Sequence, residues 1–227
     1  AMGMTEPAAG TDVLGMQTTA RRDGDHYVLN GTKRYITNAP VADVLTLMAR
    51  TGGPGASGIT AFLVPRGSPG LSFGPVDRKM GQRGTRTCDV ILEDCRVPAD
   101  AVIGGVEGRG FKTAMKVLDR GRLHIAAVCV GTAERLIADS LRYAMERKQF
   151  GKAIAEFQLV QAMLADSRTE AYAARCMVVD AARRKDAGEA IATEASCCTC
   201  ASALFEAIAA IADVFMSILL ATPHAGR

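Results

Sequence analysis

The sequence changes character at residues Asp94–Pro98, which read DCRVP. Before them, short runs of β-branched and aromatic residues alternate with Gly-, Pro- and Asn-rich turns, a pattern typical of strands. From about Phe111 the chain is rich in Ala, Leu, Arg and Glu, which favours long helices. The sequence therefore predicts an α+β protein: an antiparallel β barrel or sandwich over residues 1–100, followed by an incomplete antiparallel helix bundle over residues 101–196.

Turn signals divide the first hundred residues into expected strands. Asp23-Gly24 and Asn30-Gly31 are dipeptides that favour two-residue hairpin turns. Between such turns, we expect strands at residues 16–21, 26–29, 33–37, 44–49, 59–64, 71–76 and 87–92.

Three long helices are expected after the β domain, at residues 110–146, 156–186 and 189–220. Gly105–Gly110 superficially resembles a dinucleotide-binding fingerprint, but it follows no βαβ strand, so we interpret it as a lead-in to the first helix. The second helix carries two rows with a seven-residue spacing, which suits close antiparallel packing. These rows are Phe157, Leu164, Ala171 and Val178, and Val160, Ser167, Ala174 and Ala181.

Composition excludes several classes of protein. The net charge of +3 comes from 27 basic and 24 acidic residues among 227, a balance that argues against nucleic-acid and membrane-surface partners. Seven cysteines, an odd number, favour a reduced, cytoplasmic setting. The cluster Cys197, Cys198 and Cys200 lacks paired spacing and nearby His, so no metal site is expected. The apolar stretch 203–221 contains Glu206 and Asp213, which favours a packed helix over a membrane span.

Three segments carry a family resemblance by their order and spacing. They are Met4–Asp12 (MTEPAAGTD), Tyr35–Asn38 (YITN) and Arg147–Lys152 (RKQFGK). Together they resemble the acyl-CoA dehydrogenase family, and the resemblance extends over residues 2–196. That family uses FAD to oxidise the Cα–Cβ bond of an acyl-CoA thioester. The resemblance implies FAD as the cofactor, an electron-transfer flavoprotein as the electron acceptor, and assembly as a homotetramer or homodimer.

The resemblance places one part of a flavin site in the β domain. Reducing a flavin puts negative charge near its N1 and C2 carbonyl, which neighbouring hydrogen-bond donors must stabilise. Thr5 and the backbone around it are expected to supply those donors. Tyr35 takes the position where the family commonly has Trp beside the ring, and Thr37 is expected to bond near N5. The flavin-binding residues implied in this domain are Met4, Thr5, Glu6, Tyr35, Ile36 and Thr37.

A second part is expected near the end of the first long helix. Arg147, Gln149, Phe150 and Gln158 resemble the segment that reaches the FAD pyrophosphate and adenosine of a neighbouring subunit. The planar guanidinium of Arg suits phosphate because it donates two parallel hydrogen bonds. The alternative is a solvated basic patch at a helix C-terminus, where cations are favourable anyway.

Substrate contacts are implied for Thr11, Asp119 and Arg122, although charges within a helix often form a solvated face. One branch of the family places its catalytic glutamate at the position of Gly121, which cannot abstract a proton. We therefore expect the base from a late C-terminal segment, and nothing after Ser196 resembles it.

These observations lead to expectations about the ends of the chain. We expect a chain cut from a larger protein, with a divergent or frameshifted, helical tail over residues 197–227. Exposed apolar rows on the second helix would then favour aggregation. Two functions besides that of an acyl-CoA dehydrogenase stay open: a non-catalytic remnant that binds flavin weakly or not at all, and an acyl-CoA oxidase on the same fold.

Overall fold

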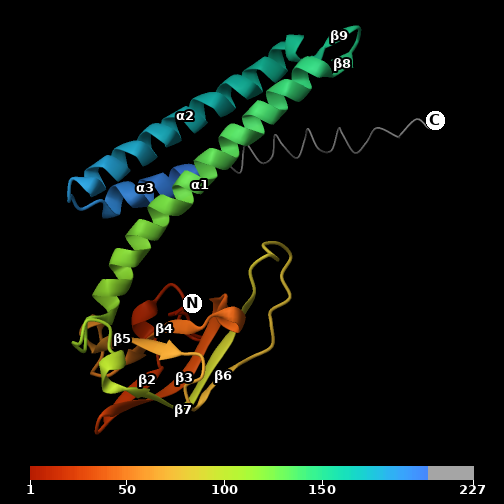
Figure 1. Ribbon diagram of the computed structural model, residues 1–227. Coiled ribbons are helices and arrows are strands. Elements are labelled where there is room, and N and C mark those ends of the chain that lie inside the picture. Colours follow the sequence, from red (N-terminus) through yellow and green to blue (C-terminus); the bar gives the residue numbers. More distant parts are fainter. Residues whose placement is uncertain (204–227) are drawn as a thin grey trace. The chain divides into compact units, whose positions relative to one another are not determined.

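The computed structural model describes residues 1–203, which fall into two compact units. The first unit comprises Ala1–Lys116 and contains the β-sheet, and the second begins at Val117 and contains the long helices (Figure 1). The order of elements, strands first and helices second, confirms the predicted α+β class.

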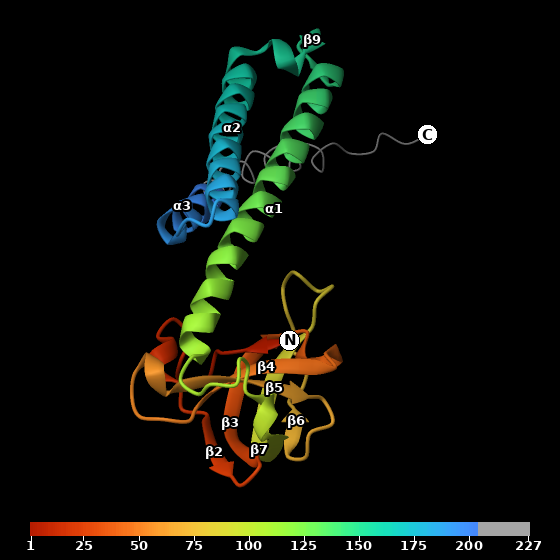
Figure 2. The ribbon, with the colours of Figure 1, turned by 60° about the vertical axis from the view of Figure 1, so that its left-hand side comes forward.

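The first unit is a seven-stranded, mostly antiparallel sheet that curls around its core (Figure 2). Its two longest strands, β3 and β7, pair antiparallel, with β2 beside β3 and β6 beside β7. Strand β4 pairs antiparallel with β5 and parallel with β1 and β2, so the sheet is not antiparallel throughout. The strands are β1 (Met2–Gly3), β2 (Thr19–Asp23), β3 (His26–Thr37), β4 (Val44–Arg50), β5 (Ile59–Pro65), β6 (Leu71–Phe73) and β7 (Thr87–Pro98).

One of the two expected hairpin turns is confirmed and the other is wrong. At Asp23-Gly24 the chain reverses tightly between β2 and β3, with Gly24 at φ +63°. Asn30-Gly31 instead lies inside β3, where the register with β7 shifts between Leu29 and Gly31. The Asn30 side chain donates to Asp94 Oδ1 (3.0 Å) and accepts from the Asp94 N–H (2.8 Å). These bonds hold a β-bulge, so the two strands predicted here are one.

The sheet encloses an apolar core, and the start of the first helix adds to its margin. Phe111, Ala114 and Met115 pack with residues of β4 and β5. A Cβ added to Gly110 would lie 2.6 Å from the carbonyl carbon of Thr60, so the helix can begin this close to β5 only with glycine. The compact unit therefore extends to Lys116, beyond the boundary near residue 100 that the composition suggests. The lead-in role predicted for residues 105–110 is confirmed.

Three α-helices follow in the described part of the chain: α1 (Gly110–Glu146), α2 (Gln158–Asp186) and α3 (Ala192–Ala203). A two-stranded hairpin, β8 (Lys148–Gln149) and β9 (Lys152–Ala153), joins α1 to α2. Short 3₁₀ helices occupy Val13–Gly15, Ala39–Val41, Ala56–Gly58, Ala99–Ala101 and Ile154–Glu156. Residues 204 onward lie outside the described part of the chain. They include much of the predicted helix over residues 189–220, most of the expected tail over 197–227 and nearly all of the apolar stretch 203–221.

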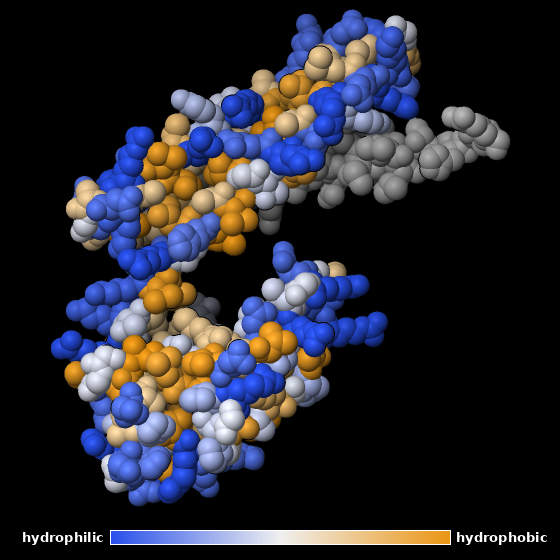
Figure 3. Space-filling view, in the orientation of Figure 1, coloured by the Kyte–Doolittle hydropathy of each residue, from blue (hydrophilic) through white to orange (hydrophobic). Residues whose placement is uncertain are grey.

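Small residues line the contact between α1 and α2. Ala133 of α1 clusters with Ala171, and Ala126 clusters with Ala181 and with Cys198 of α3. Ser167, Ala171, Ala174 and Ala181, from the two predicted rows, are all buried. This confirms that the rows face a neighbouring helix. On the visible face of the helical unit, apolar residues also reach the surface (Figure 3). No helix among residues 1–203 is long and apolar enough to cross a membrane.

Replacing Gly31 by alanine is expected to destabilise the first unit by about 2–4 kcal/mol, because it combines overpacking with backbone strain. The new Cβ would lie 2.5 Å from Thr18 Oγ1 and 2.8 Å from Thr18 Cα, at a residue whose φ is +146°. Urea unfolding followed by circular dichroism measures the loss. Gly67→Ala is the matched control, since nothing lies within 4 Å of its Cβ. Equal stability of the two variants would contradict the close approach of β3 to Thr18.

Candidate functional site

The segment Met4–Asp12 begins with a tight turn. The Glu6 N–H donates to the Ala9 carbonyl (2.9 Å), and the Ala9 N–H donates to the Glu6 carbonyl (3.2 Å). Ala9 is buried, whereas Pro7, Ala8 and Thr11 are exposed. Since the Glu6 N–H is committed to Ala9, its predicted donation to a flavin would require this turn to open.

A buried ion pair fixes the turn to the sheet. Lys33 Nζ on β3 donates to Glu6 Oε1 (2.7 Å), and the two side chains are 0% and 5% exposed. The Thr18 N–H donates to the same oxygen (3.0 Å), and the Gln17 N–H donates to Oε2 (2.6 Å). Glu6 and Lys33 are the two buried charged residues in the part of the chain that the structure describes.

Burial and hydrogen bonding act in opposite directions on this pair. Burial alone would raise the pKa of the Glu6 carboxyl, but the hydrogen bonds it accepts, Lys33 first among them, bring that pKa below its ordinary value. Burial lowers the pKa of the Lys33 ammonium, and the contact with Glu6 opposes this shift. The carboxylate therefore stays ionised at neutral pH.

The structure joins the two segments predicted to hold a flavin in the β domain. The Arg34 N–H donates to the Thr5 carbonyl (2.8 Å), directly after the Lys33–Glu6 contact. Met4 is partly buried and packs against a small apolar cluster that includes Ala9 and Met48. Residues 4–6 and 33–34 thus lie side by side, as a shared ligand site would require.

A second bulge in β3 lies between Lys33 and Ile36, and it contains the exposed residue Tyr35. The register with β7 shifts between Lys33 and Ile36, and Tyr35 adopts φ +57°, a conformation that tyrosine rarely takes. Tyr35 is 59% exposed, with the Arg34 guanidinium 4.9 Å from the centroid of its ring. Thr37 is also exposed. Ile36 is buried in the main core, so only its backbone could contact a ligand.

The residues predicted to reach the phosphates gather at the β8–β9 hairpin of the second unit. Phe150 and Gly151 both have positive φ (+51° and +80°), as a type I′ turn requires, and the Phe150 side chain is 93% exposed. Gln149 and Gln158 are exposed. Arg147 Nε is buried and has no hydrogen-bond partner among the described residues. A buried donor without an acceptor is unusual, and an anionic ligand would satisfy it.

The predicted substrate residues are divided between the two units. Arg122 donates to Asp119 Oδ1 (3.0 Å) within α1, and both side chains are partly exposed. Gly121 beside them is exposed, and a Cβ added there would meet no atom within 4 Å. Thr11 belongs to the other unit. The pairing of Asp119 with Arg122 also fits a solvated helix face, which remains the alternative.

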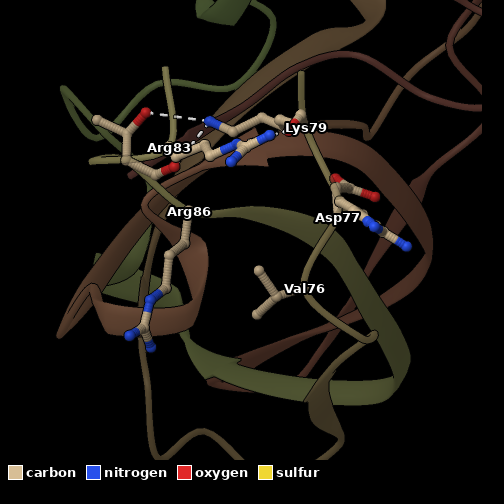
Figure 4. Close-up of a pocket in the computed structure, with 7 residues that line it drawn as sticks. Val76, Asp77, Lys79, Arg83 and Arg86 are labelled. Carbon is tan, nitrogen blue, oxygen red and sulfur yellow. Dashed lines mark hydrogen bonds between the residues drawn. The ribbon is translucent and has the colours of Figure 1, made fainter. Parts of the chain in front are cut away.

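Sequence reasoning missed a basic loop between β6 and β7. Figure 4 shows Lys79 and Arg83 on this loop, with Arg86 and Val76 around a pocket. Lys79 Nζ ties the loop together by donating to the carbonyls of Gln82 (2.8 Å) and Thr85 (2.7 Å). The charge run Asp77-Arg78-Lys79, followed by Arg83 and Arg86, was the available signal.

This loop adjoins the outward-facing end of β3. The Asn38 N–H, one residue after Thr37, donates to the Arg86 carbonyl (2.6 Å). The Lys33–Glu6 pair was missed as well, because a lone Lys in a β pattern gives no sign of burial.

Comparison with known proteins supports the family resemblance that the sequence motifs indicate. A family model described as "Acyl-CoA dehydrogenase, middle domain" matches residues 1–95, and "Acyl-CoA dehydrogenase, C-terminal domain" matches residues 108–218. The chain belongs to the acyl-CoA dehydrogenase family. The second match continues past Ser196, where the resemblance was expected to end.

Individual relatives of this acyl-CoA dehydrogenase family member are longer than it is. It is 45% identical to the "Caffeyl-CoA reductase-Etf complex subunit CarC" of Acetobacterium woodii, over 86% of this chain and 52% of that protein. It is 42% identical to a short-chain-specific acyl-CoA dehydrogenase of Megasphaera elsdenii, over 86% and 51%. The solved structure of butyryl-CoA dehydrogenase from M. elsdenii superimposes with a TM-score of 0.85 at 41% identity, covering 89% of this chain and 53% of that one. The chain thus spans about half the length of the curated relatives it matches. Those relatives belong to a family of FAD-dependent flavoproteins.

Glu6→Gln is expected to cost about 3–5 kcal/mol of stability at neutral pH, because it leaves the buried Lys33 ammonium without its counter-charge. The Glu6 pKa is lower in the folded than in the unfolded chain, so its contribution is present above the ordinary value of 4.5. It is lost as the pH falls through the lower, folded pKa. The gap in stability between parent and variant should therefore narrow in acid, as urea unfolding across a pH series would measure.

Asp23→Asn is the control for this series, because it removes an exposed partner of Arg96 (2.7 Å) and should cost about 1 kcal/mol or less. A gap between parent and Glu6→Gln that stays constant down to strong acid would contradict the buried carboxylate.

Proposed function

We propose that this chain forms the flavin-holding part of an acyl-CoA dehydrogenase, which introduces a double bond between Cα and Cβ of an acyl-CoA thioester. One observation carries the proposal: residues 4–6 are bonded to β3 immediately before the bulge that contains the exposed Tyr35. Two segments far apart in sequence, each expected to contact a flavin, therefore face one region of the first unit. A cytoplasmic setting is part of the same proposal.

The first unit would hold the ring system. Bound FAD would supply the acceptor for the hydride that leaves the substrate. The hydroxyl of Thr5 and the backbone at Met4 would donate to the pyrimidine edge, where negative charge accumulates. The exposed ring of Tyr35 would cover one side of the flavin. The exposed hydroxyl of Thr37 would lie near N5 and orient the arriving substrate.

The hairpin end of the second unit would hold the phosphates. The unpartnered Nε of Arg147 fits this role, because a pyrophosphate oxygen would satisfy it with a charge-assisted hydrogen bond. Exposed Phe150 and the amides of Gln149 and Gln158 would contact the adenosine. In the family these contacts reach the flavin of a neighbouring subunit, so the proposal includes a homodimer or homotetramer.

Substrate and electron acceptor follow from the same assignment. Thr11, Asp119 and Arg122 would contact the acyl-CoA, with Asp119 orienting the Arg122 guanidinium through their ion pair. The electron acceptor would be an electron-transfer flavoprotein, in line with the name of the A. woodii relative. The proposal assigns no catalytic base among residues 1–203, and Gly121 offers no acid–base group.

One second candidate rests on a specific observation. The A. woodii relative is named as a reductase of a CoA thioester, so the same site could run in the direction of double-bond reduction. A non-catalytic remnant and an acyl-CoA oxidase on the same fold complete the set of candidate functions.

FAD binding tests the proposal directly. The 227-residue chain should quench the fluorescence of added FAD, and Arg147→Ala should weaken FAD binding about tenfold or more, since a charge-assisted bond is lost. Riboflavin, which has no phosphate, should bind the parent and the variant equally. Lys148→Ala is the matched control, because it removes a neighbouring exposed cation.

Absence of FAD binding by the parent chain would overturn the proposal, and equal losses in the Arg147 and Lys148 variants would overturn the phosphate contact. Addition of an acyl-CoA or enoyl-CoA then separates the candidates. Bleaching of bound flavin by an acyl-CoA supports the dehydrogenase, and bound flavin that never bleaches supports the remnant. Rapid reoxidation by oxygen indicates the oxidase, and reoxidation by enoyl-CoA indicates the reductase.

A further inference from the structure

We propose that Lys33 and Glu6 are positioning residues that hold the Met4–Asp12 segment against β3 and thereby set the geometry of the flavin site. The inference rests on the function proposed above. Neither side chain is expected to touch the flavin, since both are buried. Their effect would pass through the backbone they restrain.

The pair connects three separate stretches of chain. Glu6 belongs to the tight turn, Lys33 to the centre of β3, and the Gln17 and Thr18 N–H groups to the segment entering β2. All three donors converge on one carboxylate within 3.0 Å. Moving any one stretch would leave a buried charge or a buried N–H without its partner, which is costly in a low-dielectric interior.

Lys33 lies in β3 next to residues that are proposed to form the flavin site. Lys33 is the last residue in register with β7 before the bulge, and it pairs with Val90. Arg34, the next residue, bonds to the Thr5 carbonyl, and Tyr35 then turns outward. The relative position of Thr5 and Tyr35 is thus set within two residues of the ion pair.

The aliphatic part of the Lys33 side chain also packs closely against the backbone just before Met4. A Cβ added to Gly3 would lie 3.4 Å from Lys33 Cγ and 2.6 Å from Leu47 Cδ2. The backbone at Gly3 therefore lies directly on the Lys33 side chain, one residue before Met4. The restraint acts on both ends of the Met4–Glu6 stretch.

A purely stabilising role is the competing explanation, and apolar replacement distinguishes the two. Two apolar side chains of similar volume often stabilise a fold as well as a buried ion pair does. They cannot accept hydrogen bonds from the Gln17 and Thr18 N–H groups, so they would free the turn while keeping the core filled.

The experiment uses the full chain with Lys33→Met and Glu6→Met combined. Hydrogen exchange of the flavin-free protein is measured by mass spectrometry on peptides covering residues 4–12 and, as an internal reference, β4 and β5. We expect exchange at 4–12 to rise about tenfold or more while β4 and β5 stay protected, a local opening. FAD affinity should fall about tenfold or more for the same reason, and the absorption bands of bound flavin should shift toward those of free FAD.

Two further variants keep the test decisive. Arg96→Met, which breaks the exposed pair with Asp23 (2.7 Å), should leave exchange at 4–12 and FAD affinity at parent values. If the double variant does not fold, Lys33→Met combined with Glu6→Gln replaces it, because this leaves no buried charge unpaired while the amide retains one acceptor oxygen. It should give a smaller change in the same direction.

Unchanged exchange at 4–12 in a folded variant would overturn the inference, as would FAD affinity equal to that of the parent. A parent chain that binds no FAD would contradict the proposed function instead, and the exchange comparison would still decide the positioning role.

Discussion

An ammonium and a carboxylate sealed inside the β unit impose the constraint on which the rest of the candidate site depends. Removing two charges from water is costly, and their attraction repays that cost only when the geometry is good and the remaining lone pairs are satisfied. Lys33 and Glu6 meet both conditions, because two backbone N–H groups complete the carboxylate. The same bonds leave the Met4–Asp12 segment little freedom. The need to pair the two buried charges therefore also determines where this segment lies against β3.

The second feature that shapes the candidate site is the β-bulge, which occurs twice in β3. Strand β3 has one irregularity at Asn30 and another at Arg34–Tyr35. Opposite the first, Asp94 of β7 has a positive φ of +49°. A regular strand would alternate its side chains strictly between core and solvent. The second bulge breaks that alternation, because two residues, Arg34 and Tyr35, separate buried Lys33 from buried Ile36 instead of one. Strained backbone at such positions is common where a strand presents side chains to a ligand.

The helices of the second unit pack together through small side chains. Alanine, serine and cysteine at the contacts among its helices let the backbones approach closely, and the larger side chains lie at the margins. The β8–β9 hairpin between α1 and α2 then brings together Arg147, Gln149 and Phe150, with Gln158 at the start of α2. Phe150 at the hairpin tip has a positive φ and is almost fully exposed.

The sequence by itself determined the order of strands and helices, the buried rows of α2, the Asp23-Gly24 turn and the family. Each of these follows from residues close together in the chain, whose spacing reports the local period or whose short motifs stand in order. Only the tertiary structure decided that Asn30-Gly31 is a bulge, that the first turns of α1 pack with the β unit, and that Glu6 lies inside. Asn30 is held by a residue 64 positions away, and Glu6 by one 27 positions away. An Asn-Gly dipeptide looks the same in sequence whether it forms a hairpin turn or a bulge, and a Glu looks the same whether it is exposed or buried. Strand pairing and burial depend on distant partners that only the folded chain brings together.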